Sequence, residues 1–243
     1  MKYADSFKDL KIHVWNNFLS RRKIAKACEE LISSHVEMVD AISENIKNVE
    51  NQICEWQKIQ EEDPKYDFNE EIEVFQLIAD FYRVNGRLVL IELDVKTAYK
   101  HIFLAKSDYE YRFFARRIYT LMYESDKGLV GPIGQMVKRL EEKVDDRILK
   151  IYQDEHSKLC DFLNKHHEEL KDIRNSNEAH KFSDFEVQLE SIKNLSVAGS
   201  MSLIQEFNVY LANLTMVFMV VQGALSKKLS EIVALKIGRK SGE

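Results

Sequence analysis

The chain is poor in the residues that interrupt helices. It contains eight glycines and two prolines among 243 residues. An all-β fold needs many tight turns, and those turns depend heavily on glycine and proline. We therefore expect an all-α protein made of long helices, and the 45% of hydrophobic residues is enough for a substantial buried core.

Cysteine and excess basic charge are also scarce. The chain has three cysteines, Cys28, Cys54 and Cys160, which lie far apart and form no CxxC pair. This pattern argues against a disulfide framework and against a zinc cluster. Buried reduced thiols in a cytosolic protein are expected. The net charge of −5 argues against coating nucleic acid by bulk electrostatics, although a local basic site remains open.

No segment reads clearly as a signal for export or a membrane span. The N-terminus lacks the basic-then-apolar order of a signal peptide, which predicts a cytoplasmic protein. The most apolar stretch is VYLANLTMVFMVVQGAL, 209 to 225, and it is interrupted by Asn213, Thr215 and Gln222. A bilayer span takes about 20 apolar residues. We therefore predict a buried core helix here and no membrane partner.

Periodicity predicts the organisation of the chain. Apolar residues from Ile24 to Trp56 recur at gaps of three and four, which indicates a long amphipathic helix with a coiled-coil-like seam. His35 falls on this seam and is expected to be a hydrogen-bonded core histidine. We predict one helical domain, in which long N-terminal helices (1–62) protrude from an antiparallel bundle (69–237). Further helices are expected over 69–105, 108–125, 132–173, 184–193 and 198–237, with a loop over 61–68.

Spacing removes several classes of catalytic site. No glutamate lies three residues before any of the seven histidines, so the Glu-x-x-His pairs of di-metal helical bundles are absent. HExxH, a glycine-rich phosphate loop and a GxSxG elbow are absent as well. The sequence therefore predicts neither a metal site nor a cofactor.

One segment carries chemistry: RNSNEAH, 174 to 180. If the helix continues through it, Asn177 lies between Arg174 and His180 on one broad face, since residues three apart are neighbours on a helix. Arg174 is a planar cation suited to phosphate, His180 can exchange a proton near neutral pH, and Asn175 and Asn177 add polar contacts. Together these groups could cleave an RNA backbone without a metal.

RNSNEAH resembles the motif of the HEPN superfamily, in which an arginine, a polar residue and a nearby histidine stand late in a long helix. The surrounding EELKDIRNSNEAH is similar to helical members of abortive-infection and toxin–antitoxin systems. The resemblance implies an all-α homodimer that brings two motifs into one cleft, RNA as the substrate of catalytic members, and a neutralising protein partner. Arg174 and His180 would be catalytic and Asn175 the polar neighbour.

A second segment, YEYRFFARRIYTLMYE at 109 to 124, alternates basic and aromatic side chains. Interleaved arginine and tyrosine can hold phosphate and stack bases, although aromatic residues at helical spacing are more often core. Arg116 would assist the motif if the two helices pack together. The alternative function is a non-catalytic helical scaffold that binds a partner helix along the seam from Leu31 to Trp56.

Overall fold

The structure is a computed structural model, and it describes residues 18–141, 143–178, 193 and 195–240. Every element in these ranges is helical, which confirms the all-α prediction. The elements are α2 (Phe18–Glu62), α3 (Asn69–Leu104), α4 (Asp108–Ser125), the π-helical turn η1 (Asp126–Val130), α5 (Gly131–Leu140), α6 (Asp146–Glu178) and α8 (Val197–Lys240).

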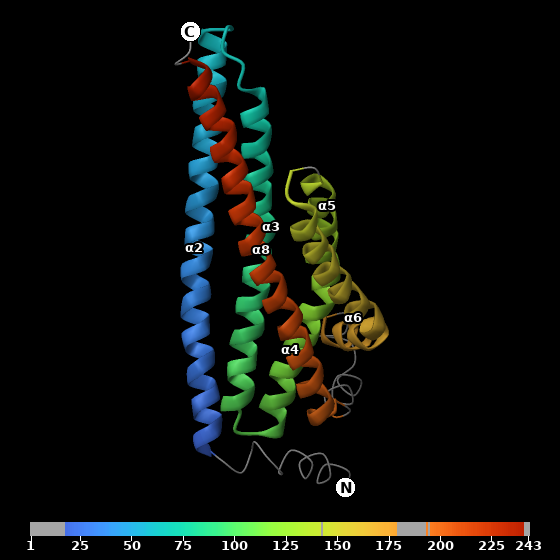
Figure 1. Ribbon diagram of the computed structural model, residues 1–243. Coiled ribbons are helices and arrows are strands. Elements are labelled where there is room, and N and C mark those ends of the chain that lie inside the picture. Colours follow the sequence, from blue (N-terminus) through green and yellow to red (C-terminus); the bar gives the residue numbers. More distant parts are fainter. Residues whose placement is uncertain (1–17, 142, 179–192, 194, 241–243) are drawn as a thin grey trace.

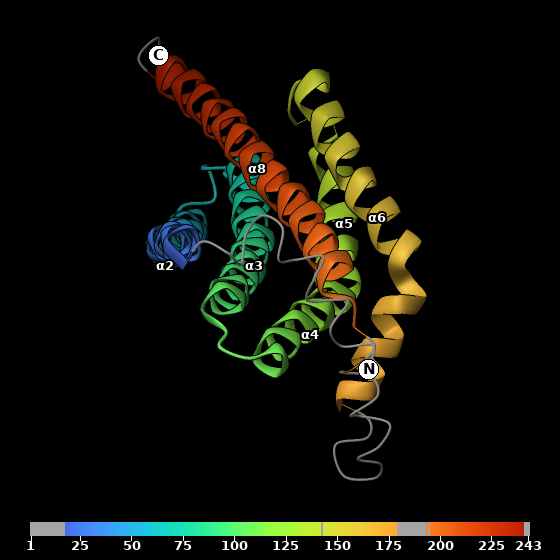
Figure 2. The same ribbon diagram turned by 90° about the horizontal axis from the view of Figure 1, so that it is seen from below.

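Helices α2 and α3 form a long antiparallel hairpin, and α8 packs against α3 (Figure 1). Helix α4 follows α3 and packs against it, and α5 and α6 lie on the side of α8 away from α2 (Figure 2). The turn of the hairpin falls at Asp63–Phe68, where Pro64 predicts it, and Trp56 stacks on Phe68 beside it. Helix α2 therefore packs against α3. The boundary expected between the N-terminal helices (1–62) and the bundle (69–237) is the turn of this hairpin.

The seam of α2 is largely closed by α3. Cys28, His35 and Ile42 are buried, while Leu31 remains 48% exposed. Of the other cysteines, Cys54 is exposed, so the expectation of a buried thiol is wrong there. Position 54 lies off the buried stripe of the helix, and the seam residue beside it is Ile53.

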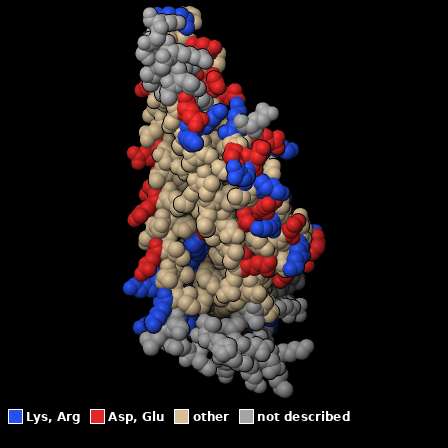
Figure 3. Space-filling model, viewed as in Figure 1, with Lys and Arg blue, Asp and Glu red and all other residues tan. Residues whose placement is uncertain are grey.

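Helix α8 is apolar on two faces, and the bundle covers one of them. Phe218 packs on Phe81 of α3 and on Tyr152 of α6. The opposite face is open, and the space-filling view shows an uncharged surface along α8 (Figure 3). The prediction of a core helix over 209–225 is thus confirmed for one face. By length and composition the Gly199–Glu231 stretch could cross a membrane, which is weak evidence because core helices pass the same test.

A buried carboxylate joins α2, α3 and α8. Glu92 of α3 is 2% exposed. Its Oε2 lies 3.0 Å from Nε2 of His35 and accepts a 2.9 Å hydrogen bond from Thr215, and its Oε1 accepts one from Lys96. His35 donates from Nδ1 to the Leu31 carbonyl oxygen over 2.7 Å, as expected for a core histidine. Burial raises the pKa of Glu92, and the contacts with His35 and Lys96 outweigh this and lower it to about 2.

The predicted helix over 132–173 is wrong as one piece, because the chain turns between α5 and α6. Asp145 accepts a hydrogen bond from the backbone N–H of Arg147 over 2.8 Å, so it starts a new helix. The apolar residues keep their helical spacing across this turn, so the spacing does not indicate where α5 ends and α6 begins. The break expected between residues 125 and 132, by contrast, does not occur, since η1 follows α4 directly and leads into α5. The helix expected over 184–193 lies almost wholly outside the described residues.

We predict that Glu92→Gln lowers the free energy of unfolding by about 3 kcal/mol, because it removes the buried carboxylate that contacts His35 and leaves the partly buried Lys96 without its counter-charge. Urea denaturation measures the change. Glu30→Gln on α2 is the control, since the Glu30 side chain is 71% exposed and its loss should cost less than about 0.5 kcal/mol. Equal effects of the two substitutions would contradict the role of Glu92.

We also predict that the stability difference between the native chain and Glu92→Gln depends on pH. The folded pKa of Glu92 is lowered from 4.5 to about 2, so its ionised form stabilises the fold above pH 4.5 and this contribution is lost as the pH falls toward 2. Urea midpoints of both proteins, measured down this range, should therefore converge. A constant difference would show that the charge of Glu92 is not what stabilises the fold.

Candidate functional site

The RNSNEAH segment begins inside the last turns of α6. Arg174 and Asn175 are partly exposed residues of this helix, which ends at Glu178. Asn177 belongs to the same helix, but its side chain is outside the described part of the chain, and so is all of His180. Of the residues predicted to form this site, the structure therefore describes only the side chains of Arg174 and Asn175.

Arg174 lies against helix α4. Its Nε donates to Oε1 of Glu124 over 3.2 Å, and its guanidinium carbon is 5.8 Å from the centre of the Tyr123 ring. The Arg174 side chain keeps 33% of its surface exposed and Glu124 keeps 49%. An ion pair this exposed contributes little to stability, so a second anion can compete for the arginine without unfolding the site.

Arg116 is held elsewhere on α4. It precedes Glu124 by eight residues, which is about 12 Å along a helix axis. It is 8% exposed, burial lowers its pKa, and its Nε has no hydrogen-bond partner within the described part of the chain. Helices α4 and α6 do pack together, as an assisting role for Arg116 requires.

The aromatic and basic residues of α4 divide between core and surface. Tyr111 and Tyr119 are buried, and burial raises the pKa of Tyr119 to about 12. Arg112 is also buried, where it donates to Asp108 Oδ2 over 2.7 Å and to the carbonyl oxygen of Leu195 just before α8. These residues support the fold, in agreement with the commoner reading of aromatic spacing.

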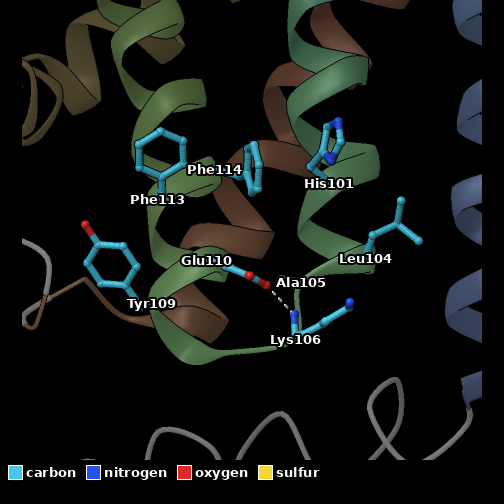
Figure 4. Close-up of a pocket in the computed structure, with 8 residues that line it drawn as sticks. All are labelled: His101, Leu104, Ala105, Lys106, Tyr109, Glu110, Phe113 and Phe114. Carbon is cyan, nitrogen blue, oxygen red and sulfur yellow. Dashed lines mark hydrogen bonds between the residues drawn. The ribbon is translucent and has the colours of Figure 1, made fainter.

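Other rings of this segment remain on the surface at the corner between α3 and α4. Tyr109 is 58% exposed and Phe113 is 54% exposed. The Phe114 ring lies between Phe113 and His101 of α3 and is stacked on His101 with ring centres 4.8 Å apart (Figure 4). A cavity of about 500 Å³ opens beside these rings. Sequence reasoning missed His101 as part of this aromatic surface, because the helical pattern of α3 does not indicate which residues of other helices lie beside it.

A second, more polar hollow of about 380 Å³ lies where α4, α6 and the start of α8 meet. His166 lines it together with Glu169 and Ser200, and His166 Nδ1 is 3.6 Å from Glu169 Oε2. The sequence indicates only that His166 continues the apolar strip of α6. The carboxylate beside it gives it a polar setting that spacing alone does not reveal.

Neither a metal site nor a known relative points to a function for the described residues. Within the ranges that the structure describes, no three His, Cys, Asp or Glu side chains gather as a metal site would require. Comparison of the chain with protein-family models, with curated proteins and with solved structures finds no match in any of the three.

Proposed function

We propose that the protein is a HEPN-like, metal-independent ribonuclease or RNA-binding protein whose site is the RNSNEAH end of α6. The observation that carries this proposal is the position of Arg174, a partly exposed guanidinium beside an aromatic ring and an exposed carboxylate. An RNA phosphate offers two oxygens to a planar guanidinium. It can therefore replace Glu124, which holds Arg174 through Nε over 3.2 Å.

The proposed reaction divides the work between two residues. His180 takes the proton from a ribose 2′-hydroxyl, and that oxygen attacks the adjacent phosphorus. Arg174 stabilises the negative charge that develops on the phosphoryl oxygens. The bond to the 5′-oxygen breaks, this oxygen gains a proton, and the products carry a 2′,3′-cyclic phosphate and a 5′-hydroxyl. Asn175 and Asn177 would contact the substrate.

The setting of this activity is part of the same proposal. We infer a cytoplasmic homodimer with a neutralising protein partner. Because the chain carries a net charge of −5, RNA must be attracted by a local group of cations and not by the protein as a whole. Arg174 is a suitable member of such a group, since it keeps a third of its surface open to solvent.

We expect the purified protein to cleave a mixed pool of structured and single-stranded RNA in EDTA, leaving 2′,3′-cyclic ends. Arg174→Ala and His180→Ala should each reduce the rate at least about 100-fold, the usual range for loss of a charge-stabilising group or a general base. Arg147→Ala is the matched control, because Arg147 starts the same helix and its side chain is 92% exposed.

The outcomes separate the active site from general charge effects. Equal losses in all three variants would indicate non-specific electrostatics and contradict the proposal. Cleavage that persists in both motif variants would place the activity elsewhere. Circular dichroism and thermal unfolding of each variant exclude loss of the fold as the cause.

We further predict that Glu124→Gln increases the affinity for single-stranded RNA several-fold. The substitution removes the carboxylate that competes with phosphate for Arg174, and it should change the stability by less than about 1 kcal/mol because the pair is exposed. Fluorescence anisotropy with a labelled oligonucleotide measures the affinity. The gain should vanish in a Glu124→Gln, Arg174→Ala double variant. An unchanged or weaker affinity in the single variant would show that Arg174 is not the phosphate contact.

One observation favours the second function, a helical interaction module. The seam of α2 is not the interaction surface of such a module, because Cys28, His35 and Ile42 are buried against the rest of the bundle. The open apolar face is on α8, where Val209 and Met216 are more than half exposed. An interaction partner would therefore dock on α8 and not on the N-terminal seam.

A further inference from the structure

The outer face of α8 carries an unpartnered apolar row. On the inner face, residues at gaps of three and four are buried: Ile204, Phe207, Leu211, Leu214, Phe218, Val221 and Leu225. On the outer face Val209, Met216, Met219 and Val220 are 53 to 66% exposed, and Ala212 and Gly223 are exposed between them. A helix that is apolar all round is usually covered all round. Here one face has no cover among the described residues.

Charged residues stand only at the two ends of this row. Glu206 precedes Val209 by three residues, and Lys227 follows Gly223 by four, with its side chain 81% exposed. The surface between these ends is uncharged and faces the viewer in Figure 3. The row is thus acidic at its start, neutral along its middle and basic at its end.

Gly223 is not required by the packing of its own chain. A Cβ atom built on it meets nothing within 4 Å, and glycine weakens a helix relative to alanine. A small residue on an exposed apolar row is the feature that lets a second helix approach closely. Ala212, on the same row, has the same effect.

We propose that α8 pairs in antiparallel fashion with α8 of a second copy of this chain, about a two-fold axis at Met216. In this register residues at equal separation on either side of Met216 face each other. Val209 then faces Gly223 of the second copy, and Ala212 faces Val220, so each large residue meets a small one. The acidic end at Glu206 lies beside the basic end at Lys227, and the two-fold axis repeats this contact.

A second copy fits this row better than a lipid surface does. The row pairs large with small residues about its own centre, a property that only a self-complementary contact uses. Between 209 and 223 it contains no tryptophan, lysine or arginine, residues that anchor an interfacial helix, and its one tyrosine, Tyr210, is half-buried and donates to Glu206. Glu206 would also face the headgroups of an anionic membrane unfavourably.

The first experiment is sedimentation equilibrium of the full chain at several concentrations. We expect a monomer–dimer equilibrium that Met216→Glu shifts toward monomer by at least about tenfold in Kd, because it places two like charges on the axis. Leu90→Glu is the control, since Leu90 is 49% exposed on α3, away from the row, and should leave the dimer unchanged. A monomer at all concentrations, or equal effects of both substitutions, would overturn the proposal.

A charge-reversal series tests the antiparallel register. Glu206→Lys and Lys227→Glu should each weaken the dimer, and the double variant should restore it, since it exchanges the two ends. A parallel pairing would place like residues together and give no rescue, which would overturn the register.

Gly223→Leu gives a test that loss of folding cannot explain. It should raise the thermal stability of the monomer, because leucine is the better helix former and the site is empty, yet it should weaken the dimer by blocking Val209 of the second copy. An unchanged dimer would contradict the proposal. Flotation with phosphatidylcholine–phosphatidylglycerol vesicles, seen together with a monomer in solution, would assign the row to a membrane instead. The α8 pairing rests on the homodimer of the proposed function and specifies its interface. Because none of these readouts uses RNA, a failure of the pairing is distinguishable from a failure of the ribonuclease activity.

Discussion

The arrangement of the long helices depends on one buried carboxylate. Glu92 is closed off from water, and a buried charge is tolerated only where opposite charges and hydrogen bonds surround it. His35 on α2, Lys96 on α3 and Thr215 on α8 supply these contacts. Since each contact needs its helix at one axial position and one rotation, the cluster determines the register of three helices that apolar packing alone would leave less specific.

The same contact decides which face of α8 is turned outward. Thr215 points to Glu92, and the next residue, Met216, is rotated by about 100° away from it. Met216 therefore lies on the open side together with Val209 and Val220. The exposed row used in the α8 dimer proposal is thus a consequence of a polar contact inside the bundle, and not of a lack of apolar residues to bury.

Much of the fold follows from helical periodicity, whereas its breaks and its polar contacts do not. Apolar spacing predicts α2, α3, α4 and α8, and Pro64 marks the hairpin turn correctly. The spacing fails at Asp145, because an N-cap can start a new helix without disturbing the apolar rhythm. It also cannot show that Thr215, expected only to interrupt an apolar stretch, binds Glu92 from 123 residues away.

The candidate site shows the same division between local pattern and distant partner. The motif resemblance implies that Arg174 lies late in a long helix, and Arg174 does lie in the last turns of α6. It says nothing of Glu124, which lies 50 residues earlier and reaches Arg174 only because α4 and α6 pack together. Likewise, the alternation of arginine and aromatic residues on α4 cannot reveal that Arg112 and Arg116 are buried while Tyr109 and Phe113 are exposed.

The pairing of Arg174 with Glu124 bears on how an acidic protein could still select RNA. A guanidinium left open would attract any anion, whereas one held by a carboxylate yields only to a ligand that binds it better. Glu124 holds Arg174 through Nε over 3.2 Å, while a phosphodiester can engage two guanidinium nitrogens at once. The carboxylate therefore lowers the affinity for every anion, and it does so least for those that offer two well-placed oxygens. In this arrangement the internal ion pair is a source of selectivity at the proposed site.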